Sequence, residues 1–162
     1  MGALESFPRI TPFLWFDNQA EDAVNFYLSI FKNSRRLDTV NNNGNRPAPA
    51  TILTIAFELD GQKFTALNGG PMFKFTEAVS FVVRCDSQEE VDHYYSKLSA
   101  GGSESQCGWV KDKFGLSWQV VPTVLAKLLG DPDPAKSQRV MRAMLTMKKL
   151  DIRALEQAYQ KP

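Results

Sequence analysis

An internal repeat constrains this chain more than any other feature of its sequence. Residues 11–31, TPFLWFDNQAEDAVNFYLSIF, align without a gap to residues 79–99, VSFVVRCDSQEEVDHYYSKLS. Phe13 falls on Phe81 and Tyr27 falls on Tyr95, an offset of 68 residues. Self-similarity at a fixed offset indicates two copies of one supersecondary unit.

Each copy is predicted to begin with a strand and to continue into a helix. The apolar runs at residues 13–16 and 81–83 have the aromatic and β-branched composition of strands. In the first copy, apolar residues at three- and four-residue spacings predict a helix over residues 20–31. Glu21 and Asp22 lie near the positive N-terminal end of that helix, where their charges are favourable.

The second helix has its own start and stop signals. Asp86 or Ser87 is the expected N-cap, and Gly101-Gly102 is expected to end the helix.

The rest of the first copy is expected to be β-structure. Residues 35–40 suit a strand, and residues 41–49, NNNGNRPAP, are rich in turn formers and predict a loop. Two β-rich runs at 51–59 and 62–67 flank Asp60-Gly61, which predicts a type I′ hairpin. The first copy is therefore predicted to be a βαβββ module.

The second copy repeats this pattern more briefly. Residues 107–111 and 116–121 are the expected strands, with Lys113-Phe114-Gly115 in the turn between them and Pro122 at the end of the pattern. The prediction is an α+β fold with two tandem βαβββ modules, in a domain that spans residues 8–122.

Residues 123–162 are predicted to form a C-terminal helical extension. Residues 124–129 suit a short helical turn, DPDP at 131–134 breaks it, and the chain is expected to be helical again from Ser137. One stripe at helical spacing consists of Met141, Met144, Leu145 and Lys148, and an apolar face continues with Ile152, Leu155 and Tyr159. We expect the extension to pack or to make subunit contacts rather than to form a site.

Composition excludes several classes of partner. Lys and Arg number 19 against 18 Asp and Glu, so the formal charge of +1 gives no field to attract nucleic acid or an anionic membrane. No apolar window approaches the roughly 20 residues of a spanning helix. The sequence predicts a soluble, cytoplasmic protein in which Cys85 and Cys107 are most simply small apolar residues, with a redox pair as the alternative.

Three stretches of the chain resemble one known family. The segments PFLWFDNQAEDAVNFY, LDGQKFTALNGGP and DKFGLSWQVVP are similar to the vicinal-oxygen-chelate superfamily, which includes glyoxalase I, bleomycin-resistance proteins and extradiol dioxygenases. Within it they resemble the PhnB-like branch, often named demethylubiquinone methyltransferase. The resemblance implies that paired modules curl into a half-open, cup-shaped sheet and that the protein is a homodimer.

The resemblance also implies where a metal would bind. In metal-dependent relatives, the first and last strands of each module each supply one ligand. Those positions fall here at Thr11 or Pro12, Asn68, Ser80 and Gln119. All are neutral, and none supplies the charge that offsets the dehydration of a divalent ion. We therefore expect no metal and no other cofactor.

Strand alternation predicts which residues line the cup. Three face-sharing sets are expected: Trp15 with Phe13 and Thr11, Asn68 with Ala66 and Phe64, and Gln119 with Ser117 and Val121. Trp118 is expected on the opposite face from Gln119, and Cys107 and Trp109 share a face of the neighbouring strand. The candidate ligand-binding residues are Thr11, Trp15, Asn68, Ser80, Cys107, Trp109 and Gln119.

Two functions remain open on this evidence. A metal-free protein that binds a small apolar or aromatic molecule suits the neutral, aromatic lining, although the same aromatics are also suited to filling a core. A divalent-metal lyase, isomerase or dioxygenase with unusual ligands is the alternative.

Other enzymatic chemistry has few candidate residues. The only histidine, His93, lies in a predicted helix, and Glu58 and Glu77 are candidate carboxylate bases at strand or loop edges. No glycine-rich strand-to-helix turn is present to hold a methyl donor.

Overall fold

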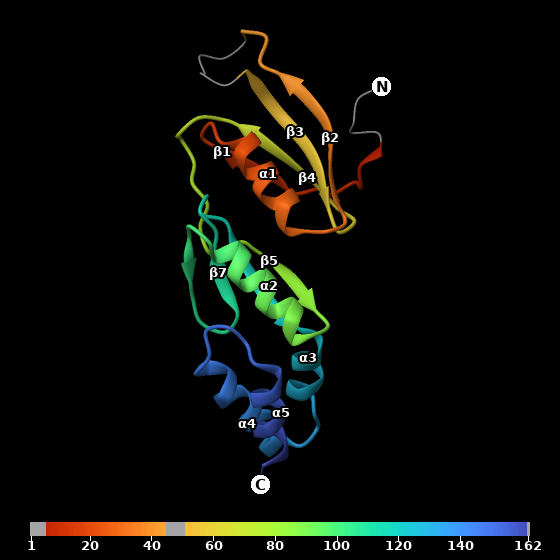
Figure 1. The fold of residues 1–162 in the computed structure, drawn as a ribbon, viewed down its shortest axis with the longest axis vertical. Helices are drawn as coiled ribbons and strands as arrows, with labels where there is room; N and C mark the ends of the chain where they lie inside the picture. The colour runs from red at the N-terminus through yellow and green to blue at the C-terminus, as the bar shows by residue number, and fades with distance from the viewer. Residues whose placement is uncertain (1–5, 45–50, 162) are drawn as a thin grey trace. The chain divides into compact units, whose positions relative to one another are not determined.

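The computed structural model describes residues 6–44 and 51–161. The chain divides into two compact units, one ending at Phe75 and the other beginning at Thr76. Each unit has a four-stranded sheet with one long helix across it (Figure 1). No helix among these described residues is long and apolar enough to cross a membrane.

The first unit is a βαβββ module. Its elements are β1 Phe13–Phe16, α1 Ala20–Ile30, β2 Ser34–Asn41, β3 Ile52–Leu59 and β4 Gln62–Asn68. The strand order is β1-β4-β3-β2, in which β1 pairs with β4 in parallel and the other pairs are antiparallel. Asp60 and Gly61 both have positive φ, 48° and 86°, which confirms the predicted hairpin turn. Residues 45–50 of the predicted loop lie outside the described residues.

The second unit repeats the module and adds the extension. Its elements are β5 Ser80–Cys85, α2 Gln88–Ser99, β6 Ser103–Glu104, β7 Trp109–Lys111, β8 Ser117–Pro122, α3 Thr123–Leu129, α4 Pro134–Leu145 and α5 Ile152–Gln160. The strand order β5-β8-β7-β6 reproduces that of the first unit. The predicted α+β class, with tandem βαβββ modules and a C-terminal helical extension, is confirmed.

Aromatic stacking joins helix and sheet in the first unit. Tyr27 of α1 is fully buried and stacks on Phe57 of β3, and Phe57 stacks on Phe64 of β4 with ring centroids 5.2 Å apart. Leu14 and Phe16 of β1 are buried as well. This burial removes roughly several hundred Å² of apolar surface from water, and each Å² contributes roughly 25 cal/mol to the stability of the folded state. Among the described residues of this unit, no helix covers the opposite face of the sheet.

The two copies of the repeat differ by one residue between strand and helix. Tyr27 and Tyr95 are both buried, so the helices match at the sequence offset. Phe13, however, is 59% exposed, whereas Phe81 packs against the buried Trp118 with ring centroids 5.7 Å apart. The loop before α2 is one residue shorter than the loop before α1. Because successive strand residues point to opposite faces, this difference turns Phe81 to the face opposite that of Phe13. The gapless alignment is therefore wrong in the strands.

Asn68 fastens helix α1 to the end of β4. Its Oδ1 accepts a hydrogen bond from the backbone N–H of Ala20 at 2.9 Å, and its Nδ2 donates to the carbonyl of Ile52 at 2.9 Å. The first helical N–H groups have no partner within the helix, and Gln19 at the N-cap offers no side-chain bond. Asn68 therefore supplies, from a distant strand, a cap that the local sequence lacks.

Helix α2 is capped locally instead. Ser87 accepts a hydrogen bond from the N–H of Glu90, which decides between the two predicted N-caps. The helix ends at Ser99, and Gly101 follows with φ at 76°.

The C-terminal extension packs within the second unit. Its buried core consists of Leu125, Leu128, Val140, Leu150 and Leu155. Helix α4 begins at Pro134 with Asp133 as N-cap, three residues before the predicted start, because proline is favoured in the first turn. The predicted stripe is only partly buried: Leu145 is 58% exposed and Lys148 lies beyond the helix.

The segment before β7 donates backbone hydrogen bonds to this extension. Cys107 was predicted to start a strand, but its φ is 56° and β7 begins at Trp109. The N–H groups of Cys107 and Gly108 donate to the carbonyls of Met147 and Lys148 at 2.8 and 2.7 Å. Competition from these carbonyls explains why the predicted strand is shortened.

Replacing Asn68 should destabilise the first unit. Asn68→Ala leaves the Ala20 N–H and the Ile52 carbonyl without their side-chain partner, so we expect a loss of about 1–3 kcal/mol. Urea unfolding followed by circular dichroism measures this. Asn33→Ala, at an exposed asparagine, is the control, expected within about 0.5 kcal/mol of the parent. Equal effects of the two substitutions would contradict the capping role.

The two cysteines should react differently in the folded protein. Cys85 is fully buried, and its burial raises the pKa of the thiol to about 12, so it stays protonated at pH 8. Cys107 is partly exposed. We expect a disulfide reagent at pH 8 to label Cys107 alone, and Cys107→Ser to abolish native labelling while unfolding still exposes Cys85. Fast labelling of the Cys107→Ser protein in its native state would show that Cys85 is accessible.

Candidate functional site

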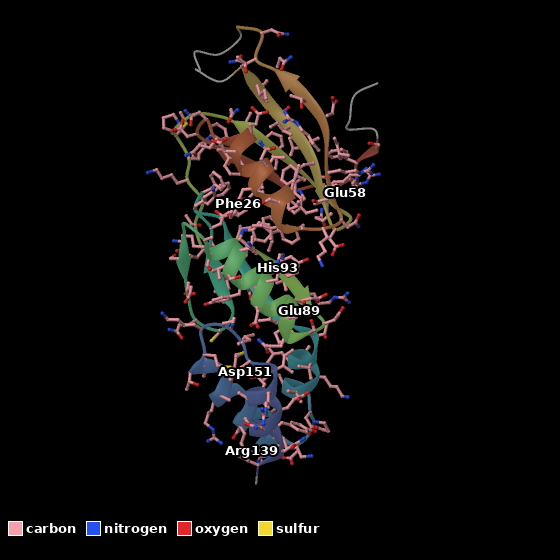
Figure 2. The ribbon with its side chains drawn as sticks, in the orientation of Figure 1. Phe26, Glu58, Glu89, His93, Arg139 and Asp151 are labelled. Carbon is pink, nitrogen blue, oxygen red and sulfur yellow. The ribbon has the colours of Figure 1, made fainter. Side chains whose placement is uncertain are left out.

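The face of each sheet opposite its helix, here called the open face, carries the candidate site. In strands β5, β7 and β8 of the second unit, pairing registers and strand alternation place eight residues on the open face: Ser80, Val82, Arg84, Trp109, Lys111, Ser117, Gln119 and Val121. Helix α2 covers the other face, where Val83, Cys85, Trp118 and Val120 are buried. Figure 2 labels His93 on α2, so the only histidine belongs to the helix and not to the open face.

Gln119 and Ser80 form a polar pair on this face. The Nε2 of Gln119 donates a hydrogen bond to the Oγ of Ser80 at 2.9 Å, and both residues are half-buried. Gln119 lies between two apolar neighbours on the adjoining strands, Val82 on β5 and Trp109 on β7. Val82 is 62% exposed. The centre of the face is therefore a neutral polar pair flanked by an exposed aliphatic and an aromatic side chain.

The charged residues of this face are paired with acids. Lys111 forms an ion pair with Glu77, and Arg84 lies 3.6 Å from Asp86. The hydrogen bond from Lys111 holds the pKa of the Glu77 carboxyl below its usual range. A general base needs a pKa near neutrality, so this shift disfavours the role considered for Glu77.

The first unit has an open face of its own, with Trp15 partly covered. The indole Nε1 of Trp15 donates to the carbonyl of Gly70 at 2.8 Å, and its ring meets Phe73 edge-on at 4.9 Å. Gly69 passes so close that a Cβ there would overlap the Trp15 ring. Phe13 on the same strand face remains exposed, so it is the freer aromatic of this sheet.

Thr11 and Glu58 have partners in the first unit. Thr11 precedes β1, and its hydroxyl donates to the carbonyl of Pro8 at 2.9 Å. Glu58, labelled in Figure 2, accepts a hydrogen bond from Arg35 at 3.3 Å. Both side chains are therefore already engaged by groups of the protein.

Two of the sequence-predicted residues lie away from the open faces. Asn68 shares its face with Ala66 and Phe64, as predicted, but that face is the one packed against α1. Cys107 lies before β7, and its thiol donates to the carbonyl of Met144 at 3.6 Å. The structure therefore brings together Ser80, Trp109 and Gln119, and places Asn68 and Cys107 in structural contacts.

Thr65 is one of the open-face residues that sequence reasoning missed. It pairs with Phe13 on β1, as Gln119 pairs with Val82 on β5. Phe13 and Val82 are both three residues before the buried end of their strands. Counting back from the strand ends, rather than following the gapless repeat, would have identified Thr65 in place of Asn68.

The donor set does not fit the divalent metal that the fold family implies. Metal-dependent relatives carry their ligands on the first and last strands of each module. At or beside those positions this chain has the hydroxyls of Thr11, Thr65 and Ser80 and the amide of Gln119, all of which are neutral. One hydrogen bond already joins Ser80 and Gln119. Within residues 6–44 and 51–161, no cluster of three or more His, Cys, Asp or Glu is arranged to hold a metal ion.

Comparisons with known proteins agree with this architecture. A family model described as 3-demethylubiquinone-9 3-methyltransferase matches residues 8–121. The structure of the PhnB protein from Bacillus cereus is 32% identical, with a TM-score of 0.66, covering 72% of this chain and 100% of that one. None of the curated proteins matches the chain.

Two more distant structures share the fold alone. The fosfomycin resistance protein FosX from Listeria monocytogenes is 15% identical with a TM-score of 0.57, covering 76% of this chain and 98% of that one. A glyoxylase/bleomycin resistance protein/dioxygenase domain from Frankia sp. is 13% identical with a TM-score of 0.50, covering 72% and 92%. The repeated modules, the family match and the Bacillus relative together show that this chain belongs to the PhnB-like 3-demethylubiquinone-9 3-methyltransferase family of the vicinal-oxygen-chelate superfamily.

Proposed function

We propose that this protein binds a small apolar or aromatic molecule without a metal, on the open face of the second sheet. One observation carries the proposal: the hydrogen-bonded Ser80–Gln119 pair stands at the superfamily's metal positions, between the exposed Val82 and Trp109. Such a surface offers apolar contact together with a few uncharged polar groups, the usual composition of a small-molecule site.

Charge supports a neutral ligand. The cations of the face, Arg84 and Lys111, are each paired with an acid. An anionic ligand would have to compete with Asp86 and Glu77 for these cations.

The family name suggests methyl transfer, which these residues do not support. Gly69 and Gly70 follow β4 and close over Trp15, and no helix begins there. A methyl donor is usually held by a glycine-rich turn that opens a helix. We therefore propose binding rather than methyl transfer as the role of the open face.

Several broader expectations are also proposals. We propose that residues 8–122 form the binding domain and residues 123–162 its extension. We also propose that the protein is a homodimer and that it is located in the cytoplasm. The exposed Met141 and Leu145 of α4 are the residues of the extension best placed for a subunit contact.

Binding should quench tryptophan emission and depend on Val82. We expect the uncharged probe N-phenyl-1-naphthylamine to quench the protein's fluorescence saturably. Val82→Lys should weaken binding about tenfold, because burial of a valine side chain contributes about 1.5 kcal/mol. Val79→Lys is the matched control, since Val79 is equally exposed at 62% but lies outside β5. Equal weakening by both substitutions, or quenching that never saturates, would rule out this face.

Divalent metals should leave the stability of the protein unchanged. Because the open-face donors are neutral, we expect Mn²⁺, Ni²⁺ and Zn²⁺ to leave Tm unaltered in a thermal melt. The variant Ser80→His with Gln119→Glu is the positive control. Its Tm should rise by on the order of 3 °C once free Zn²⁺ reaches tenfold its Kd. A comparable metal-dependent rise in the parent, lost in Ser80→Ala with Gln119→Ala, would favour a metal-dependent lyase, isomerase or dioxygenase instead.

A further inference from the structure

We infer that the ligand carries an uncharged group with a hydrogen-bond donor beside an acceptor, such as a carboxamide or a lactam, and that the Ser80–Gln119 pair recognises it. This inference rests on the proposed binding function and adds the chemical class of the ligand.

The hydrogen bond between the two side chains fixes what each still offers. The Nε2 of Gln119 donates to the Oγ of Ser80 at 2.9 Å, so the serine oxygen is used as an acceptor and its own hydrogen is left to donate. The Oε1 of Gln119 accepts no hydrogen bond from the described residues. The pair therefore presents a carbonyl acceptor next to a hydroxyl donor.

A carboxamide complements that arrangement with its own two atoms. Its N–H can donate to the Oε1 of Gln119 while its carbonyl accepts from the hydroxyl of Ser80 or from the second hydrogen on Nε2. A ketone has no hydrogen to donate to Oε1. A carboxylate would set an oxygen against Oε1 and bring a charge that the paired Arg84 and Lys111 do not neutralise.

The neighbours of the pair indicate what the amide is attached to. In the strand register, Gln119 has the exposed Val82 on one side and Trp109 on the other. The indole N–H of Trp109 makes no hydrogen bond within the described part of the chain, so no such bond fixes the orientation of the ring there. A flat apolar body therefore lies against these two side chains, with the amide over the polar pair.

Three naphthalene compounds separate these possibilities. Calorimetric titration of the full chain with 2-naphthamide, 2-acetylnaphthalene and 2-naphthoate compares an amide, a ketone and a carboxylate on one aromatic body. We expect the amide to bind about tenfold tighter than either of the others, since only the amide donates a hydrogen bond to the Oε1 of Gln119. The Trp109 indole resonance in ¹H–¹⁵N NMR spectra should shift with all three.

Variants of Gln119 test whether the pair is responsible. Gln119→Leu should remove the preference for the amide while the naphthalene body still binds. Gln119→Met keeps the length of the side chain, guards against misfolding of the leucine variant, and should also lose the preference because it has no Oε1 to accept the amide N–H. Gln157→Leu makes the same change on the exposed surface of α5 and should leave all three affinities unchanged.

The outcomes distinguish this inference from the proposed function. Equal affinity for all three compounds, or tightest binding of the carboxylate, would overturn the assignment of an amide while leaving a binding face in place. An amide preference that survives in both Gln119 variants would overturn the role of the pair. No saturable binding of any compound, with an unmoved Trp109 resonance, would overturn the proposed function and this inference together.

Discussion

Each module depends on the packing of one helix against one face of its four-stranded sheet. In the first unit this packing is a run of stacked rings from Tyr27 through Phe57 to Phe64, and in the second the buried Val91, Tyr95 and Leu98 of α2 serve the same purpose. Because strand residues alternate between faces, the choice of the buried face also decides which residues form the open one. The candidate site is therefore set by where the helix lies.

The contact between helix and sheet is completed by polar groups that the helix itself does not supply. Asn68 provides a cap for α1 from the end of β4, and Ser87 caps α2 from the adjacent residue. The first arrangement uses a strand residue and buries its side chain. Strand alternation places Asn68 on the face packed against α1, and the neutral Thr65 lies on the open face beside Phe13.

The second unit couples its open face to the C-terminal extension. Cys107 and Gly108 are hydrogen bonded to residues 147 and 148, and Gly108 has no room for a side chain because Val120 and Leu150 lie against it. Trp109 follows directly and starts β7. Gln88 strengthens the same region, since its side chain bonds both Leu150 and Ile152. The extension is thus part of the framework that positions Trp109 beside Gln119.

The sequence alone determined the repeated βαβββ order, the Asp60-Gly61 hairpin and the neutral character of Ser80 and Gln119, because local turn chemistry and residue type decide these features. Two outcomes required the tertiary structure. A loop one residue shorter before α2 reverses the face of Phe81 relative to Phe13, and no local signal registers that shift. Cys107 lies outside its predicted strand, where its N–H bonds the distant carbonyl of Met147. Asn68 lies outside its predicted site because its face of β4 packs against α1, where it accepts a hydrogen bond from Ala20. Strand propensity describes a residue's own preference, whereas burial and long-range hydrogen bonds depend on which segments fold against it.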